Sequence, residues 1–279
     1  MNDFIISNIN KLKQKKIPNP EIDLRILLNY SKYKKYKNKN ILLSNFVLDQ
    51  INIKKFNLLL NRRLSKEPIS KIINKKSFWK DDFFVNHFVL DPRPETEAII
   101  EESLNIIKNK KAYLKILDIG TGSGAIAISL AREFVNAKIY AIDISIEAIK
   151  VAKINIIEKN LQNQIKLKHG SLDSIKEKFD LIVSNPPYLS KNEITKTGIE
   201  IKNFEPKIAL DGGEDGLDFY KEFAKKIPKI MNKNSHMILE IGENQLKNCK
   251  QIFRYSSLNL LKKTQDLQKK DRIMVLSKL

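Results

Sequence analysis

The stretch ILDIGTGSGAIAISLA, at residues 116–131, decides the fold. Residues 115–119 are β-formers with no glycine or proline, which is the pattern of a short buried strand. Glycine stands at every second position of the turn 120–124, so backbone amides there can approach a ligand that side chains would block. An apolar helical pattern follows at 125–132. Strand, glycine turn and helix in this order favour a parallel α/β sheet with a ligand site at the turn.

The chain after this unit repeats the alternation of strand and helix. The pattern of apolar residues there predicts strands at 139–143, 165–169, 180–185 and 236–241 and helices at 146–158, 217–230 and 244–253. It also predicts a closing strand pair near 258–267 and 272–277. Alternating strands and helices predict an α/β domain with a doubly wound, largely parallel sheet.

The chain before this unit has a different pattern. Apolar residues at helical spacing predict short helices at 1–17, 21–30 and 49–64, and the aromatic run at 76–91 predicts a hairpin. Two alternating prolines then lead into a helix at 95–108. We therefore predict a helical domain at 1–75, a β-hairpin and linker at 76–97, and the main domain at 98–279.

Composition limits the classes of function. One cysteine and three scattered histidines offer no disulfide framework and no metal site, so a reducing cytoplasm is the expected compartment. No segment has the apolar length of a membrane span, and the first 16 residues lack the apolar run of a signal peptide. The net charge of +19 is spread along the chain, which favours a compositional bias over a nucleic-acid-binding patch.

Asp143 ends the strand that follows the glycine turn, 23 residues after Gly120. A carboxylate at this place binds the hydroxyl groups of a ribose, so the expected ligand is a nucleoside. With Ala125, the turn also satisfies the looser dinucleotide pattern G-x-G-x-x-G/A, and at this point NAD remains possible.

The tetrapeptide NPPY, at residues 185–188, follows the predicted strand 180–185 and so lies at the ligand-binding edge of the sheet. The Asn185 amide oxygen and the Pro186 carbonyl are two uncharged acceptors that suit a planar NH2 group. Tyr188 offers a ring face to a flat amide or base, or to a cation. No hydride partner for a nicotinamide is evident, so this edge favours methyl transfer from S-adenosylmethionine over NAD chemistry.

Six separated motifs give the chain a family resemblance. The glycine turn with Asp143 and NPPY resembles amino-group methyltransferases. Four further motifs restrict the resemblance to one family within that group: DPRPETE (91–97), FEPKIALDGGEDGLDFY (204–220), LEIGENQ (239–245) and DRIMV (271–275). Together they resemble the bacterial release factor glutamine N5-methyltransferases. The resemblance implies a Rossmann-like class I methyltransferase sheet with a small N-terminal helical domain. It also implies methyl transfer from S-adenosylmethionine to the glutamine of the Gly-Gly-Gln motif in class 1 release factors.

Family roles carry over by position. The cofactor-binding residues would be Gly120, Thr121, Gly122, Ser123, Gly124, Asp143 and Asn185. The substrate amide would lie against Asn185, Pro186, Pro187 and Tyr188, of which Asn185, Pro186 and Tyr188 are the catalytic candidates. Leu172 stands where the family often has an aromatic residue beside the adenine, and Asn74 and Asp91 depart from the family pattern at the domain junction. The helical domain would help to hold the release factor, and we expect a monomer.

Two alternatives remain. A DNA or RNA adenine N6-methyltransferase shares the NH2 geometry, and a positive net charge would help it to hold phosphates. No basic target-recognition domain interrupts or follows the core, so we expect no direct nucleic-acid substrate. A non-catalytic interaction protein is the second alternative, and the intact glycine turn, Asp143 and NPPY argue against it.

Overall fold

The computed structural model describes residues 3–38 and 40–278. The chain divides into two compact units. Unit 1 comprises the described residues up to Asn74 together with Gly198–Phe204, and unit 2 comprises Lys75–Thr197 and the described residues from Glu205 onward. The return of residues 198–204 to the N-terminal unit has no counterpart in the sequence analysis.

Unit 1 is helical. It contains α1 (Asp3–Gln14), α2 (Pro20–Tyr30), α3 (Ile53–Leu64), α4 (Ile69–Ile73) and α9 (Ile199–Phe204). The apolar stripes of the first three helices meet in one core, in which Leu12, Leu24 and Phe56 are fully buried. The predicted start of the third helix at 49 is wrong: residues 48–50 form a 3-10 turn, and Asn52 caps the helix by accepting a hydrogen bond from the Lys55 amide.

Buried Arg63 attaches the returning helix α9 within unit 1. Its guanidinium donates to Asp23 of α2 at 2.6 Å and to Glu200 of α9 at 2.7 Å. Because the Arg63 side chain is only 5% exposed, these charge-assisted bonds lie in a partly dry environment. An ion pair between residues 63 and 200 therefore joins two segments that are distant in sequence.

Unit 2 begins with a hairpin that is shorter than the predicted one at 76–91. Its strands are β1 (Lys76–Phe78) and β2 (Asp81–Phe83), and the chain from residue 84 to 91 forms no strand. The reason is a side chain: Asn155 donates to the Phe84 carbonyl at 2.9 Å and accepts from the Phe84 amide at 2.7 Å. Asn155 thus replaces the hydrogen bonds that a partner strand would supply.

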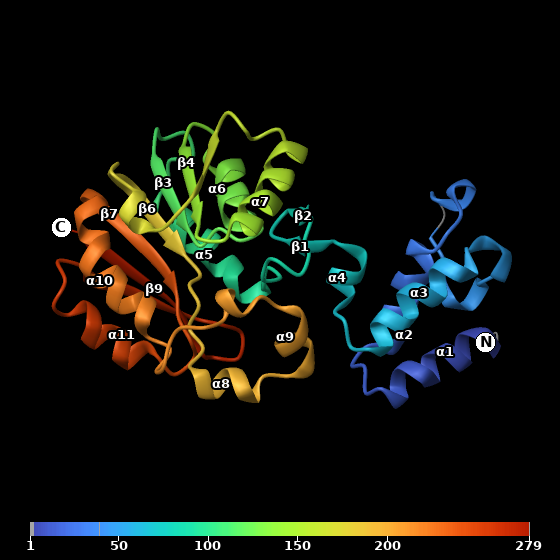
Figure 1. Cartoon of the computed structure of the whole chain (residues 1–279). Coiled ribbons are helices and arrows are strands. Elements are labelled where there is room, and N and C mark those ends of the chain that lie inside the picture. The colour runs from blue at the N-terminus through green and yellow to red at the C-terminus, as the bar shows by residue number, and fades with distance from the viewer. Residues whose placement is uncertain (1–2, 39, 279) are drawn as a thin grey trace. The chain divides into compact units, whose positions relative to one another are not determined.

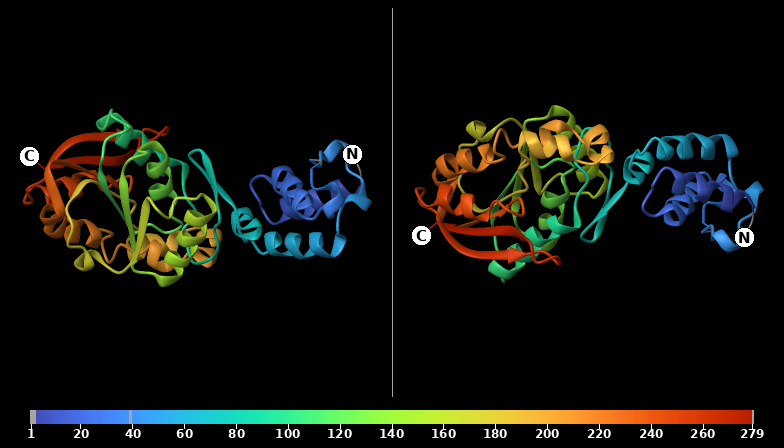
Figure 2. Two further views of the ribbon diagram at one scale, coloured as in Figure 1. Left: turned by 90° about the horizontal axis from the view of Figure 1, so that it is seen from above. Right: turned by 90° about the horizontal axis from the view of Figure 1, so that it is seen from below.

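A seven-stranded sheet forms the centre of unit 2 (Figure 1). Its strand order is β5-β4-β3-β6-β7-β9-β8. The strands are β3 (Lys115–Ile119), β4 (Lys138–Asp143), β5 (Ile165–His169), β6 (Phe179–Ser184), β7 (Met231–Glu240), β8 (Asn259–Gln265) and β9 (Asp271–Lys278). The first five in this order are parallel, whereas β9 and β8 are antiparallel additions. Both views of Figure 2 show these terminal strands side by side in red. The predicted doubly wound, largely parallel α/β sheet is confirmed.

Helices cover both faces of the sheet (Figure 1). One face packs against α5 (Glu97–Ile106), α6 (Ala125–Glu133) and α7 (Ile146–Glu158), and the other packs against α10 (Asp218–Ile230) and α11 (Leu246–Phe253). Neighbouring strand residues alternate between the two cores, as Ile116 and Leu117 show. Both faces are therefore buried, which explains the nearly continuous apolar runs of β3 and β6.

Two further features depart from the predicted pattern. β7 begins at Met231, five residues before the predicted start at 236, and its register against β6 shifts after the Phe179–Met231 pair. The segment between NPPY and the predicted helix at 217–230, for which no element is predicted, contains the short helix α8 (Lys191–Lys196) as well as α9. Across the described residues, no helix combines the length and the apolar character that crossing a membrane requires.

Candidate active site

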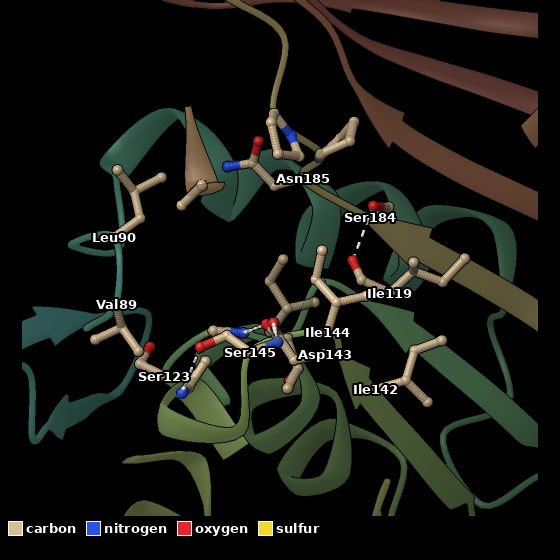
Figure 3. Close-up of a pocket in the computed structure, with 18 of the residues that line it drawn as sticks. Val89, Leu90, Ile119, Ser123, Ile142, Asp143, Ile144, Ser145, Ser184 and Asn185 are labelled. Carbon is tan, nitrogen blue, oxygen red and sulfur yellow. Dashed lines mark hydrogen bonds between the residues drawn. The ribbon is translucent and has the colours of Figure 1, made fainter. Parts of the chain in front are cut away.

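An open pocket lies in unit 2 at the carboxyl ends of the parallel strands. The loops after β3 and β6 and the end of β4 contribute to its wall, because parallel strands end at the same edge of the sheet. Figure 3 shows Asn185 on one side of this pocket and Ser123, Asp143 and Ser145 on the other. The lining includes the predicted site residues Gly120, Thr121, Gly122, Ser123, Asp143, Asn185, Pro186 and Pro187, together with Leu172.

The glycine turn is held against β4 by backbone hydrogen bonds. The amides of Gly120 and Thr121 both donate to the Ile142 carbonyl at 2.9 Å. Gly120, Gly122 and Gly124 have φ angles of 71°, 55° and 81°, a left-handed conformation that side chains disfavour. Gly124 does not line the pocket, and a Cβ there would make only ordinary contact with Ala152 of α7, so its positive φ angle is what favours glycine.

Asp143 connects the end of β4 to the glycine turn. Its Oδ2 accepts from the Gly122 amide at 2.9 Å, and its Oδ1 accepts from the Ser145 amide at 2.9 Å. Burial raises the pKa of this carboxyl above its ordinary value, although the two backbone donors oppose the shift. A carboxylate offers about four acceptor positions, so Asp143 can hold the turn and still accept from two neighbouring hydroxyl groups of a ligand.

Asp118 is a buried carboxyl behind the pocket wall to which the sequence analysis gave no role. It lies on β3 beside the pocket residues Ile119 and Thr121 and is fully buried. Its Oδ2 accepts from the Thr121 hydroxyl at 2.6 Å, whereas its buried Oδ1 has no hydrogen-bond partner in the described chain. Burial is the largest cause that raises its pKa to about 7, and the nearby Asp143 contributes to the same shift. Asp118 therefore supports the glycine turn through Thr121 and does not line the pocket.

A hydrogen-bond chain fixes the orientation of Asn185. Its Nδ2 donates to the Thr96 hydroxyl oxygen at 3.0 Å, and the Thr96 hydroxyl donates to Glu240 Oε2 at 2.6 Å. The Asn185 Oδ1 accepts no hydrogen bond from any residue that the structure describes. The amide oxygen is therefore available as an acceptor in the pocket wall, next to Pro186. Thr96 and Glu240 lie inside the motifs DPRPETE and LEIGENQ, but the sequence analysis gave them no role.

Tyr188 stands apart from the other predicted substrate residues. It does not line the pocket, and its hydroxyl donates to Glu240 Oε1 at 3.3 Å. Burial and the adjacent Glu240 carboxylate raise the pKa of the Tyr188 phenol, so it stays protonated as a donor. Direct contact between the Tyr188 ring and a substrate stays a prediction.

The loop after NPPY is braced by two of the motifs. The Leu189 amide donates to the Leu210 carbonyl at 3.0 Å, and the Gln245 side-chain amide donates to the Tyr188 carbonyl at 2.8 Å. A Cβ at Gly216 would overlap the Tyr188 carbonyl, so only glycine permits this close approach. The DGGEDG loop and the LEIGENQ segment thus hold the backbone that follows Asn185.

Comparisons with known proteins agree with this site. The family model described as "Methyltransferase small domain" matches residues 102–203. A protein of Rickettsia typhi named "Bifunctional methyltransferase" is 40% identical over 98% of this chain and 56% of its own length. This chain therefore spans about half the length of that relative.

Two other proteins match over most of their length. The "Release factor glutamine methyltransferase" of Clostridium acetobutylicum is 36% identical over 91% of this chain and 90% of its own length. A methyltransferase structure from Pyrococcus furiosus shares the fold, with a TM-score of 0.50 at 17% identity over 81% of this chain and 98% of its own. The pocket at the glycine turn, NPPY and the similarity to the Clostridium protein agree, and the chain belongs to the family of release factor glutamine methyltransferases.

Proposed function

We propose that the chain transfers a methyl group from S-adenosylmethionine to the side-chain amide nitrogen, N5, of the glutamine in the Gly-Gly-Gln motif of class 1 peptide chain release factors. The observation that carries this proposal is the orientation of Asn185: its NH2 group is bound to Thr96, and its oxygen remains available at the pocket. The name of the Clostridium acetobutylicum relative, which is matched over nearly its whole length, supports the same substrate.

The residues around the pocket fit S-adenosylmethionine. Asp143 has acceptor positions left for the two ribose hydroxyl groups, and the positive φ angles of the glycine turn keep side chains away from the ligand. We propose that these residues bind the cofactor, with Leu172 among the apolar residues around it.

The bound cofactor would supply an electrophilic methyl group on a sulfonium. An amide nitrogen is a poor nucleophile because its lone pair is delocalised into the carbonyl. Asn185 Oδ1 and the Pro186 carbonyl can accept one hydrogen each from the substrate NH2, which orients the nitrogen and favours its pyramidalisation. Positioning of this kind contributes on the order of 7–11 kcal/mol in well-oriented reactions. The proton leaves after transfer, when the nitrogen is acidic.

Unit 1 would recognise the protein substrate. None of its described residues lines the pocket, and several of its large apolar side chains are exposed. Leu42, Val47 and Leu58 are each more than half exposed. Exposed apolar groups on a small helical unit are suited to contact with another protein. We propose that this unit holds the release factor.

Transfer of radiolabelled methyl groups tests this function. The purified chain would be incubated with labelled S-adenosylmethionine and either a class 1 release factor, the same factor with its Gly-Gly-Gln glutamine replaced by alanine, or duplex DNA. We expect label in the unaltered release factor alone. Label in DNA would instead support an adenine N6-methyltransferase, and equal label in both release factors would exclude the glutamine as the acceptor.

A further inference from the structure

Three segments that are far apart in sequence meet behind Asn185. Thr96 belongs to a 3-10 turn before α5, Glu240 ends β7, and Asn185 follows β6. The Thr96 hydroxyl lies between the other two side chains, 3.0 Å from Asn185 Nδ2 and 2.6 Å from Glu240 Oε2. Thr96 is 3% exposed and Glu240 is 2% exposed, so bulk water does not compete for the hydrogen bonds of these two side chains. The three side chains form one continuous hydrogen-bond chain that ends at the pocket.

When Glu240 is ionised, the hydrogen bonds that link Asn185, Thr96 and Glu240 can run in only one direction. A carboxylate only accepts, so the single hydroxyl proton of Thr96 must point to Glu240. The Thr96 oxygen is then left as an acceptor, and Asn185 must offer it the NH2 side of its carboxamide. The second Glu240 oxygen accepts from Tyr188, which holds the carboxylate in place.

The direction of these hydrogen bonds decides whether Asn185 presents an acceptor or a donor to a ligand in the pocket. With Asn185 Nδ2 turned to Thr96, the pocket wall offers an oxygen, which can accept from a substrate NH2 group. An Asn185 carboxamide turned by 180° would place its N–H groups against those of the substrate and leave the Thr96 oxygen without a donor. The two orientations have nearly the same shape, so packing alone does not separate them.

We propose that Thr96 and Glu240 are positioning residues that hold the Asn185 carboxamide in the acceptor orientation required for methyl transfer to an NH2 group. This inference rests on the proposed function and adds the residues that set its selectivity for an NH2 acceptor. Thr96 is itself among the residues that line the pocket, whereas Glu240 is not. Both act through Asn185, and their loss therefore has a signature that differs from loss of a cofactor contact.

The charges around Glu240 come from several elements. Arg272 of β9 favours its ionised form, whereas Glu95 of the 3-10 turn opposes it, and Tyr188 donates to it. Tyr220 of α10 donates to the Glu240 backbone carbonyl at 3.4 Å. Burial is the largest cause that raises the Glu240 pKa to about 7. Experiments at pH 8 therefore examine the ionised, acceptor-only state.

The first test compares Thr96→Val with Thr96→Ser, because valine removes the hydroxyl and keeps the shape, whereas serine keeps the hydroxyl. Single-turnover methyl transfer to a release factor and the cofactor dissociation constant would be measured at pH 8. We expect Thr96→Val to lower the transfer rate roughly 10- to 100-fold, as loss of one buried hydrogen-bond partner does, while the dissociation constant changes less than about 3-fold. Thr96→Ser should rescue the rate. A fully active Thr96→Val protein, or a serine variant as slow as the valine variant, would overturn the inference.

The same pair of substitutions in an Asn185→Ala background separates a positioning role of Thr96 from a role in folding or cofactor binding. If Thr96 acts through Asn185, then Thr96→Val has less than about a 2-fold further effect once the carboxamide is absent. An equal loss in both backgrounds would show that Thr96 supports the fold or the cofactor instead, and would overturn the proposed role.

A second readout needs no substrate. The side-chain NH2 signals of Asn185 would be assigned by NMR from their loss in Asn185→Ala, and their hydrogen exchange measured at pH 8. We expect one protected proton in the unaltered protein and in Thr96→Ser, and none in Thr96→Val. An unprotected NH2 group in the unaltered protein would overturn the inference even if the release factor is methylated. If the release factor is not methylated, the proposed function fails, and this exchange measurement still decides the orientation of Asn185.

Discussion

Replacement of Glu240 by glutamine should change how the stability of the protein depends on pH. Glu240 is 2% exposed, and its pKa is raised from 4.5 to about 7, mainly by burial. Between these two values the folded protein retains a proton that the unfolded chain has released. The free energy of unfolding must therefore fall as pH rises through this window. Glutamine has nearly the same shape and no proton to release, so Glu240→Gln removes this part of the pH dependence.

The size of the effect follows from the two pKa values. A shift of one pKa unit corresponds to about 1.36 kcal/mol, so the full window is worth about 3 kcal/mol. Between pH 5 and pH 8, the part of the window that can be measured, the change is about 2.5 kcal/mol. We therefore expect the difference in unfolding free energy, Glu240→Gln minus unaltered protein, to rise by about this amount from pH 5 to pH 8. Buried Asp118 is present in both proteins, so its own titration largely cancels in the difference.

Urea unfolding at pH 5, 6, 7 and 8 measures this difference. The matched control is Glu101→Gln, which removes a negative charge from the exposed face of α5 and leaves the site intact. The control measures the effect of removing one exposed carboxyl from the same unit. A Glu240→Gln difference that stays flat, or that falls as pH rises, would refute the conclusion that burial holds this carboxyl in its neutral form up to about pH 7.

Three further predictions follow from the site and the two units. Asp143→Asn should weaken cofactor binding roughly 10-fold or more, because one carboxylate oxygen becomes a donor beside the Gly122 amide; unchanged affinity by calorimetry would remove Asp143 from the binding site. Asn185→Asp should bind the cofactor at least as tightly and transfer slowly, because a carboxylate attracts the sulfonium in the ground state and loses that attraction as the methyl group leaves; full activity on an intact release factor would contradict the role of Asn185. A chain that begins at Lys75 should bind cofactor and methylate release factor poorly, and a folded fragment without cofactor affinity would show that unit 1 helps to build the pocket.

Much of unit 2 could be predicted because its elements have strong local patterns. The strand at 165–169 and the helix at 146–158 have the predicted bounds, since apolar spacing and flanking polar residues mark both ends. The start of β7 could not be predicted in the same way. Its first residues, 231–235, are mostly polar and two of the five are exposed. Met231 pairs with Phe179 of β6 and Ser235 pairs with Lys278 of β9, so this part of the strand depends on partners that are distant in sequence. The family resemblance is confirmed by relatives matched over most of their length.

The parts of the site that escaped prediction depend on tertiary contacts. The glycine turn, Asp143 and Asn185 were predictable because each follows a strand whose end faces the ligand edge. Thr96 and Glu240 carry no local signal of their role, since it arises only when a turn and two strand ends meet. Asp118 could have been found, because a carboxylate inside an otherwise apolar strand is costly unless it serves a ligand or partner. The attachment of α9 through Arg63 and Glu200 likewise has no pattern along the chain.

Mass spectrometry of the methylated product tests the central claim most directly. A class 1 release factor would be incubated with the chain and S-adenosylmethionine, digested, and its peptides sequenced. We expect the mass gain of a single methyl group on the side-chain amide of the Gly-Gly-Gln glutamine. This gain should be strongly reduced with Asn185→Ala. A methyl group on any other residue, or an unmodified glutamine in a reaction with active cofactor, would contradict the central claim.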